Sequence, residues 1–434
     1  MVIVDSIRCC YCGGCVSVCP TDALTLAETR LTVNENRTDC ENCVFACPVG
    51  ALHLEGKAET ARGETIKRRY DVVVVGAGPG GSTAAHVAAQ AGLSALLLEK
   101  RQEIGSPVRC AEGVGHDQLA QFIEPDPKWI AAEINQLEIT ARANGAAQTW
   151  HAGGGRGYIL ERRIFDRVLA ERAAKAGAEV RVKTSVTGVV IENGRVRGVK
   201  IRRGDFWGGA GEMEIESQIV IAADGVEAQV GRWAGLDTQL PLNDTMACAQ
   251  FLLAGISLDP TCTYYTISDE FAPGGYVWVF PKGDGKANVG LGVQADLPRR
   301  ANAIELLTRF IEAQPNLARG YPVTLVAGNV PVALPPARIV GDGVVLIGDA
   351  ARQVDPLTGG GIINAMIAGR IAAQVAVDAI AARDVSANFL SRYADEWRKT
   401  RGSKMERNYR LREKFPPQRR NDKRFVHAFM LAAK

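Results

Sequence analysis

The chain has 434 residues, of which 47% are hydrophobic and 23% charged, and its net charge is +3. This length and composition suffice to bury a core in two or three domains, and they exclude a disordered protein. The small net charge argues against a protein that binds nucleic acid through bulk positive charge, so we expect no nucleic-acid partner. Charged residues interrupt the N-terminus too early for a signal peptide, and no uninterrupted apolar run approaches the ~20 residues of a membrane-spanning helix.

Cysteines are concentrated at the start of the chain, where the first 47 residues hold eight of the eleven. Their clustering suits a metal cluster in a reducing compartment better than a secreted disulfide framework. Four of them have the spacing C-x2-C-x2-C-x3-C and are followed by proline: Cys9, Cys12, Cys15 and Cys19. This run resembles that of bacterial ferredoxins, whose first three thiolates hold one iron–sulfur cluster while the fourth reaches the other.

The cysteine pattern is duplicated, because Cys40, Cys43 and Cys47 repeat its last three positions 28 residues later. Exchange of ligands between the two halves predicts one complete 4Fe-4S site, formed by Cys9, Cys12, Cys15 and Cys47. Cys10 stands outside the pattern, and we expect it to bind no iron.

The second site is incomplete, since the counterpart of Cys9 is Arg37, which cannot bind iron. Only Cys19, Cys40 and Cys43 remain there. This site could hold a 3Fe-4S cluster, a 4Fe-4S cluster with a non-cysteine ligand, or no cluster. A four-thiolate zinc site is the alternative for the whole segment, although the cysteine spacing is not typical of zinc. We expect an α+β ferredoxin-like module over residues 1–56 and a linker over residues 57–69, which lack apolar periodicity.

A nucleotide-binding pattern follows the linker. The apolar run 70–75 predicts a strand that ends at the turn Gly76-x-Gly78-x-x-Gly81, and small residues from Ser82 predict a helix. Glycines let the backbone approach a pyrophosphate at the start of such a helix. Glu99 closes the next predicted strand and is placed to bind a ribose hydroxyl, and we assign Lys100 to the same site.

The glycine turn alone does not show whether the nucleotide is FAD or NAD, but two later segments favour FAD through a family resemblance. Asp224 follows the apolar run 219–223, and Asp349 follows the run 344–347. They are similar to the second and third fingerprints of flavoproteins of the p-hydroxybenzoate hydroxylase class. That resemblance implies that Asp349 contacts the ribityl chain of FAD and that the loop with Gly360, Gly361 and Ile362 surrounds the flavin ring. It also implies that Arg162 contacts the flavin, the alternative being a solvated arginine at a helix start.

Aromatic residues alternate in the segment that precedes a predicted hairpin turn at 284–285. Tyr276, Trp278 and Phe280 are spaced to lie on one face of a strand, and residues 287–293 supply the partner strand. We call these three side chains the aromatic wall. Such a face is core packing more often than a ligand site. The string P-x-x-Y-x-W-x-F-P-K-G followed by N-V-G-x-G, however, resembles the signature of geranylgeranyl reductases.

The segment 105–113 also resembles that family, which places a cysteine beside the flavin at the position of Cys110. The resemblance therefore implies Cys110, Tyr276 and Trp278 as active-site residues, whereas we expect Cys248 and Cys262 to be inert buried thiols. It further implies an α/β FAD-binding domain of Rossmann type over residues 70–239 and 335–385. An antiparallel-sheet substrate domain would cover residues 240–334.

The two resemblances together imply an FAD-dependent reductase that saturates isoprenoid double bonds of membrane lipids. Electrons from a low-potential donor would reach FAD one at a time through the 4Fe-4S module. One alternative is an enzyme similar to electron-transfer flavoprotein:quinone oxidoreductase, which passes electrons to a quinone. Others are a flavin monooxygenase or halogenase, which an oxygen-sensitive cluster argues against, and an electron carrier with a vestigial flavin site.

The C-terminal segment 386–434 is a predicted helical tail, and its residues 398–434 hold 13 Lys and Arg against 3 Asp and Glu. A solvated, partly packed terminal helix is one interpretation. The other is electrostatic attachment to anionic lipid headgroups, which a lipid substrate favours. We therefore expect a cytoplasmic protein that associates peripherally with the inner face of the membrane.

Overall fold

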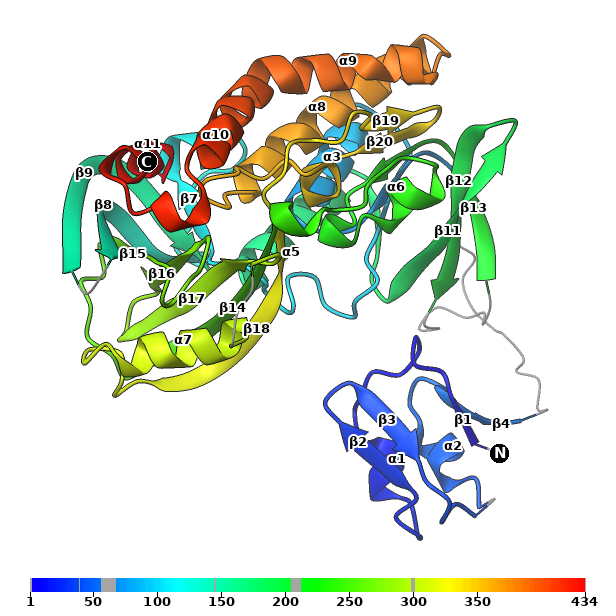
Figure 1. Ribbon diagram of the computed structural model, residues 1–434. Helices are drawn as coiled ribbons and strands as arrows, with labels where there is room; N and C mark the ends of the chain where they lie inside the picture. The colour runs from blue at the N-terminus through cyan, green and yellow to red at the C-terminus, as the bar shows by residue number, and fades with distance from the viewer. Residues whose placement is uncertain are drawn as a thin grey trace.

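The computed structural model describes residues 2–38, 40–55, 68–143, 146–203, 212–297 and 301–433. These residues form a small N-terminal module and two eight-stranded sheets with their helices (Figure 1). Most of the predicted linker lies outside the described residues, and its last two residues lead directly into strand β5.

The N-terminal module has the two-fold repetition that the cysteine pattern predicts. Antiparallel pairing joins its first strand to its last, and the middle two strands to each other. Each half carries one short helix with a buried cysteine, Cys15 or Cys43, in a core of aliphatic side chains. The elements are β1 (Val2–Val4), α1 (Gly14–Ser17), β2 (Leu24–Ala27), β3 (Arg30–Val33), α2 (Asn42–Ala46) and β4 (Leu52–Leu54).

The first large sheet has the strand order β10-β6-β5-β13-β12-β11, with β20 beside β13. Its strands β10, β6, β5, β13 and β20 run parallel, and Val72, Val73 and Leu96 are fully buried, so both faces of the sheet are covered at these strands. The strands are β5 (Arg69–Val75), β6 (Ala95–Leu98), β10 (Glu179–Arg181), β11 (Thr184–Glu192), β12 (Arg195–Arg203), β13 (Glu212–Ala222), β19 (Val340–Gly341) and β20 (Val344–Leu346). This is the α/β sheet that the sequence predicts.

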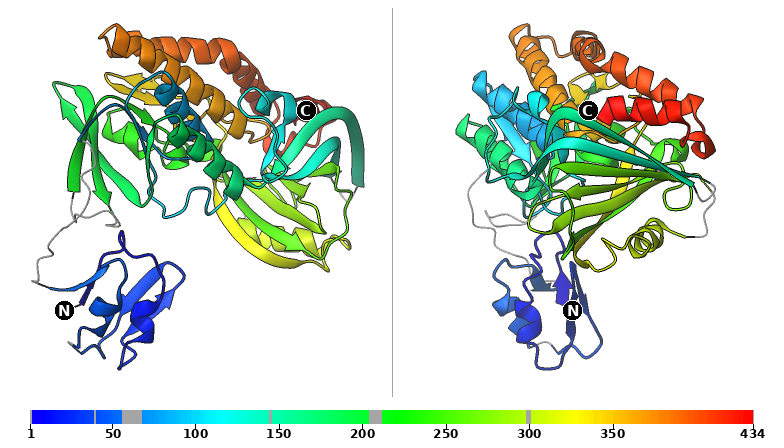
Figure 2. Two further views of the ribbon diagram at one scale, coloured as in Figure 1. Left: turned by 180° about the vertical axis from the view of Figure 1, so that it is seen from behind. Right: turned by 90° about the vertical axis from the view of Figure 1, so that its left-hand side faces the viewer.

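Helices α3, α5 and α8 pack beside this sheet, and Figure 2 shows α8 running next to α3. α8 begins at Ile362, and it is long and apolar enough to span a membrane. However, 72% of that apolar window is buried inside the protein, so it is a core helix. The helices on this side of the molecule are α3 (Pro79–Gln90), α5 (Arg162–Lys175), α6 (Gln229–Trp233) and α8 (Ile362–Ala381), with the 3-10 turns η1 (Gly225–Glu227) and η3 (Gly348–Ala351). Helix α4 (His116–Leu119) and the 3-10 turn η2 (Leu242–Asp244) instead contact strands of the second sheet.

The second sheet has the order β18-β14-β17-β16-β15-β8-β9-β7 and is antiparallel except where β15 runs parallel to β8. The predicted hairpin is present, since β16 pairs with β17 and Tyr276 stands opposite Gly292. Helix α7 (Ala303–Glu312) packs against β14 and β17. The strands are β7 (Gly113–Gly115), β8 (Ile130–Ala143), β9 (Ala146–Leu160), β14 (Thr245–Ala254), β15 (Cys262–Ser268), β16 (Tyr276–Pro281), β17 (Lys286–Gln294) and β18 (Tyr321–Pro331).

One expected boundary needs correction, because strands β7, β8 and β9 do not belong to the first sheet. The sequence interpretation placed residues 113–160 in the FAD-binding domain, whereas they extend the second sheet. The reason is that the edge of β15 hydrogen-bonds to β8, from Cys262 opposite Gln136 to Ser268 opposite Arg142. A pairing across so long a stretch of chain leaves no local signal in the sequence.

The C-terminal segment packs onto both sheets and is not a free tail. α9 (Ala387–Trp397) lies along α8, a π-helical turn (Arg398–Gly402) leads into α10 (Ser403–Lys414), and α11 (Lys423–Ala433) lies against β8 (Figure 1). A 3-10 turn (Pro417–Arg419) joins the last two helices. Arg412 and Arg420 are buried, so part of the basic charge of this segment is structural.

Candidate active site

The N-terminal module holds its cysteines in two separate groups. A small cavity is lined by Cys9, Cys12, Cys15 and Cys47, together with Cys10 and apolar side chains. These are the four residues proposed for the complete cluster, so the donor set fits a 4Fe-4S cluster. The backbone N–H of Ala51 donates a hydrogen bond to Cys47 Sγ at 3.1 Å, an interaction that stabilises a thiolate.

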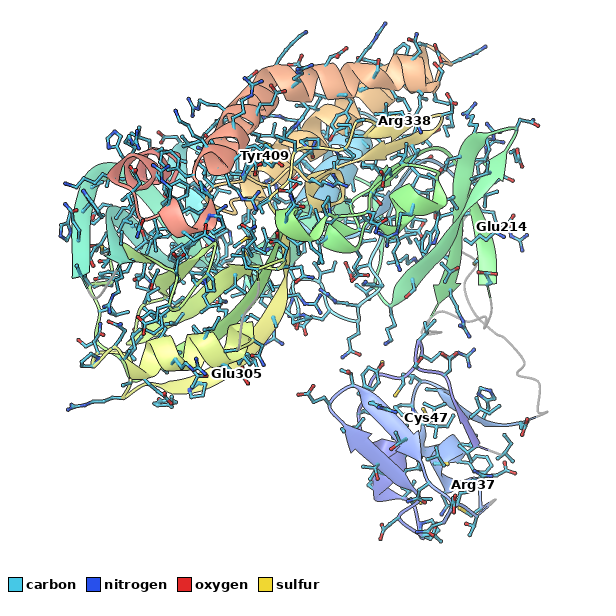
Figure 3. The ribbon with its side chains drawn as sticks, viewed as in Figure 1. Arg37, Cys47, Glu214, Glu305, Arg338 and Tyr409 are labelled. Carbon is cyan, nitrogen blue, oxygen red and sulfur yellow. The ribbon has the colours of Figure 1, made fainter. Side chains whose placement is uncertain are left out.

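Cys19, Cys40 and Cys43 form the second group. Burial raises the pKa of Cys43, and the neighbouring Cys40 and Cys19 add to that rise. Arg37 is exposed, and Figure 3 shows it at the edge of the module, whereas Cys47 lies in its interior. Among the described residues, no group of three or more Cys, His, Asp or Glu side chains is close enough to share one ion.

The glycine turn after β5 packs closely against neighbouring backbone because its glycines have no side chains. A Cβ on Gly76, whose φ is +104°, would lie 2.3 Å from Ala223 O, and a Cβ on Gly81 would lie 1.9 Å from Gly76 O. Gly78 has no atom within 4 Å of a built Cβ, so the backbone there faces open space. These are the three properties that a pyrophosphate-binding turn requires.

Glu99 faces this turn. Its carboxylate accepts hydrogen bonds from the backbone N–H groups of Ala77, at 3.1 Å, and Arg101, at 3.0 Å. The carboxylate therefore lies beside the first helix turn, where a ribose hydroxyl of a bound nucleotide would meet it. Lys100 instead forms an ion pair with Glu227 at 2.6 Å, and both side chains are about half exposed, at 47% and 42%. The pair closes one side of the same cavity.

A single cavity of about 650 Å³ joins the predicted nucleotide residues to the predicted substrate residues. It is lined by all three glycines of the turn, Glu99, Lys100, Asp224, Asp349, Gly360, Gly361 and Ile362, and also by Cys110, Arg162, Tyr276, Trp278 and Phe280. The Oδ1 atom of Asp224 is buried and has no hydrogen-bond partner within the described part of the chain. Such an unpaired buried acceptor fits a bound ligand that donates to it, so these residues fit FAD.

Arg162 lies at the centre of the cavity wall and is not a solvated side chain. It binds Asp166 through two hydrogen bonds, of 3.1 and 2.6 Å, and only 16% of its side chain is exposed. Burial acts to lower the pKa of Arg162, but Asp166 and then Cys110 outweigh it, so the pKa is raised and the guanidinium stays charged. Burial raises the pKa of Asp349, and Arg162 counteracts that rise.

Cys110 lies beside Arg162 and accepts a hydrogen bond from the backbone N–H of Glu112 at 3.2 Å. Burial raises the pKa of the Cys110 thiol, although Arg162 opposes the rise. Cys110 therefore carries its proton at neutral pH. Cys248, which the sequence interpretation left as an inert thiol, also lines the cavity, and burial raises its pKa to about 12.

The aromatic wall is extended by two residues that sequence analysis did not identify. Tyr265 of β15 has its ring 5.7 Å from that of Tyr276 and 5.3 Å from that of Phe280. Phe429 of α11 has its ring 5.0 Å from Tyr276 and 5.4 Å from Tyr265. The alternation within β15 could have identified Tyr265, whereas no local signal connects Phe429 with residues 150 positions earlier.

A buried ion pair that the sequence analysis also missed connects the Cys110 loop with the hairpin. Lys282 Nζ lies 2.5 Å from Glu112 Oε2, and both side chains are at most 6% exposed. The same oxygen accepts a hydrogen bond of 2.7 Å from Asn288, and the other carboxylate oxygen accepts one of 2.8 Å from the Arg162 backbone N–H. A buried charge pair with further hydrogen bonds fixes geometry more than it adds stability. Lys282 directly follows β16 and Asn288 lies within the apolar strand β17, so their polarity indicates a buried partner without identifying Glu112.

Comparison with protein families matches this arrangement in three places. Residues 2–25 match a 4Fe-4S binding domain, residues 71–286 an FAD dependent oxidoreductase, and residues 244–330 a geranylgeranyl reductase catalytic domain. Among curated proteins, the digeranylgeranylglycerophospholipid reductase of Methanocella arvoryzae is 50% identical over 80% of this chain and 88% of its own length. A second reductase of that name, from Methanococcoides burtonii, is 48% identical over 81% of this chain and 85% of its own.

This chain belongs to the geranylgeranyl reductase family. A geranylgeranyl bacteriochlorophyll reductase-like protein from Thermoplasma acidophilum superimposes with a TM-score of 0.78 at 40% identity, over 84% of this chain and 96% of that one. A flavin-dependent brominase superimposes with a TM-score of 0.66 at 20% identity, over 84% of this chain and 90% of that one, which shows the shared fold alone. The cofactors of this family member are FAD and an iron–sulfur cluster in the fused N-terminal domain.

Proposed function

We propose that this protein reduces the double bonds of geranylgeranyl chains carried by membrane glycerolipids. The observation that supports this function most strongly is the single cavity, which is lined both by the glycine turn with Asp349 and by the aromatic wall. Phe425 and Phe429 continue the apolar lining beyond Tyr276. An isoprenoid chain needs an apolar tunnel, and a flavin-dependent reduction needs that tunnel to open onto the flavin site.

The chemistry of the alkene determines what the side chains must do. An isolated trisubstituted double bond is a poor hydride acceptor, so a proton must reach one carbon as a hydride reaches the other. Bound FAD supplies the hydride and converts single electrons into pairs. The protein must therefore hold an acidic proton beside the alkene and exclude water from the cavity.

Cys110 Sγ is the proton donor in this proposal. Its burial keeps the thiol protonated at neutral pH, and the adjacent Arg162 guanidinium stabilises the thiolate that remains after transfer. The O–H of Tyr276, whose pKa burial raises well above the ordinary value, instead donates to the Thr358 carbonyl through a short hydrogen bond. Tyr276 thereby positions the loop around Gly360, and Trp278 lines the path of the chain.

Electrons enter through the cluster bound by Cys9, Cys12, Cys15 and Cys47, from a low-potential donor. Cys12 is exposed and Cys9 is buried, so a cluster held by these cysteines would be accessible from solvent at Cys12. This asymmetry suits a relay between an external donor and the flavin. The test is Cys12→Ser in the intact chain: chemical reduction of the flavin by dithionite should persist, while lipid reduction with a reduced ferredoxin as donor should be lost. Full activity with the ferredoxin donor would contradict the electron path.

Peripheral attachment to the inner face of the membrane also belongs to this proposal. Among the described residues 398–433, eight Lys and Arg are exposed: Arg398, Lys399, Arg407, Arg410, Lys414, Arg419, Lys423 and Arg424. Each basic side chain near an anionic surface contributes about 1 kcal/mol. Changing Arg407, Arg410 and Lys414 together to Gln should weaken sedimentation with anionic liposomes. A variant with Lys128, Arg197 and Lys200 changed to Gln is the control, and equal losses in both variants would contradict the proposed surface.

The reductase activity itself is tested in a single anaerobic turnover. Purified yellow protein is reduced with dithionite, freed of excess reductant and mixed with a digeranylgeranyl glycerolipid. Reoxidation of the flavin with a gain of two hydrogens per double bond, detected by mass spectrometry, is the expected result. A flavin that stays reduced in the presence of the lipid would contradict the proposed function.

A further inference from the structure

Lys183 connects the N-terminal module to the first sheet. It lies at the start of β11, and the residue is only 6% exposed. Its Nζ donates a hydrogen bond of 2.9 Å to the backbone carbonyl of Cys9 and lies 5.4 Å from the centre of the Tyr11 ring. In both Figure 1 and Figure 2 the loop between β1 and α1, which carries these residues, points toward the first sheet.

The ammonium of Lys183 is buried without a carboxylate to neutralise it in the described parts of the chain. A carbonyl dipole and a ring face compensate only part of the cost of burying a charge. The remaining compensation is available at the cavity with Cys9, Cys12, Cys15 and Cys47, because a 4Fe-4S cluster with four thiolates carries net negative charge. The buried cation and the anionic cluster are therefore complementary.

The other side of Lys183 is fixed to the nucleotide site. Its backbone N–H donates to Arg101 O at 2.8 Å, and the N–H of the next residue, Thr184, donates to Glu99 O at 2.9 Å. Thr184 and Glu99 both line the large cavity. The side chain of Lys183 thus contacts Cys9, which is a proposed cluster ligand. Its backbone is hydrogen-bonded to the segment that carries Glu99, the proposed ribose-binding carboxylate.

We propose that Lys183 is the docking residue that holds the Cys9 cluster against the FAD-binding part of the chain, and that its charge raises the reduction potential of this cluster. The inference rests on the proposed function only in requiring that the cluster is present. A nearby cation stabilises the reduced cluster, which is more negative by one charge, over the oxidised one. Docking by this residue would keep the cluster beside the FAD-binding part of the chain, and the raised potential would favour electron entry into the cluster from the low-potential donor.

The docking is tested first in the unmodified chain by amine labelling. An amine-reactive reagent should modify Lys183 about tenfold or more slowly than Lys128, whose side chain is 56% exposed, as read by mass spectrometry of peptides. Tyr11→Ala removes one covering group and should accelerate labelling of Lys183 without changing Lys128. Equal labelling rates of the two lysines in the unmodified chain would overturn the proposal.

The tuning is tested by redox titration of the full chain, with the cluster followed by electron paramagnetic resonance. Lys183→Met should shift the reduction equilibrium of the Cys9 cluster about tenfold toward the oxidised form, which is ~59 mV for a one-electron couple. Lys183→Arg should retain the wild-type potential, and Lys128→Met should not change it. A Lys183→Met cluster that titrates at the wild-type potential would refute the tuning. Neither the amine labelling nor the redox titration involves lipid. Both results could therefore be interpreted even if the protein did not have the proposed reductase activity.

Discussion

Gln250 bridges two residues of the active site, Trp278 and Cys110. Its amide oxygen accepts a hydrogen bond of 2.8 Å from the indole N–H of Trp278, and its amide nitrogen donates one of 3.0 Å to the backbone carbonyl of Cys110. Gln250 is 6% exposed, so both bonds are shielded from water. The strand that carries the aromatic wall and the loop that carries the thiol are therefore positioned by one side chain.

Gln250→Leu should destabilise the protein by about 1–3 kcal/mol, because it leaves the Trp278 N–H and the Cys110 carbonyl buried without partners. It should also lower kcat, since the Cys110 loop loses its anchor. Denaturant unfolding followed by tryptophan fluorescence measures the first effect. Gln121→Leu, at an exposed position, is the matched control and should stay within about 0.5 kcal/mol of wild type. Equal stability of the Gln250 and Gln121 variants would show that the bridge carries no energy.

Cys110→Ala should reduce kcat by about 10²-fold or more, because general acid catalysis contributes at least that much to such a step. FAD content, measured by visible absorbance, should stay at the wild-type level. Cys110→Ser should recover part of the rate, since a hydroxyl can still donate a proton. Tyr276→Phe should affect KM more than kcat if it positions the loop. Wild-type kcat in Cys110→Ala would refute Cys110 as the proton donor.

Phe429→Ala should cost about 3–5 kcal/mol of stability, because the ring is 1% exposed and packs on two tyrosines. It should also raise KM for the lipid by opening the apolar end of the cavity. Leu431→Ala, on the same helix but 61% exposed, is the control. Calorimetry and lipid titration measure the two effects. Unchanged KM in a folded Phe429→Ala protein would mean that α11 does not border the substrate.

Cys248 predicts a specific dependence of stability on alkaline pH. Burial raises its folded-state pKa from 9.0 to about 12, so the folded protein holds this proton more tightly than the unfolded chain does. The resulting stability is complete below pH ~9 and is lost progressively as the pH rises toward ~12. Cys248→Ala should therefore flatten the decline in unfolding free energy as the pH rises from about 9 toward about 12. An identical decline in both proteins would contradict the burial of this thiol.

Local patterns in the sequence predicted the parts of the site that are close together in the chain. The turn at Gly76, Gly78 and Gly81 and the hairpin after Phe280 are formed by neighbouring residues, so their spacing specifies their geometry. Likewise, the duplicated cysteine spacing predicted a group that contains Cys9 and Cys47, and both residues line the same small cavity in the structure.

The remaining parts depend on contacts between distant segments. Phe429 reaches the aromatic wall only because α10 turns the chain back over β8, and the Glu112–Lys282 pair forms only when two loops 170 residues apart meet. The membership of β8 in the second sheet has the same origin. Neither residue type nor periodicity specifies such pairings, because each segment carries an apolar pattern that suits several partners. The basic C-terminal segment shows the same limit, since its composition does not distinguish buried Arg412 from exposed Arg410.

The most direct test of the central claim is a competition between the two electron acceptors that this fold could serve. Under anaerobic conditions, protein kept reduced with dithionite is mixed with a geranylgeranyl glycerolipid and a quinone together. Both compounds are followed by mass spectrometry. A reaction without protein measures the direct reduction of the quinone by dithionite, which is subtracted. We predict stepwise gains of two hydrogens on the lipid chains that depend on bound FAD. Enzyme-dependent quinol formation with untouched isoprenoid chains would contradict the account and make the aromatic wall a quinone site.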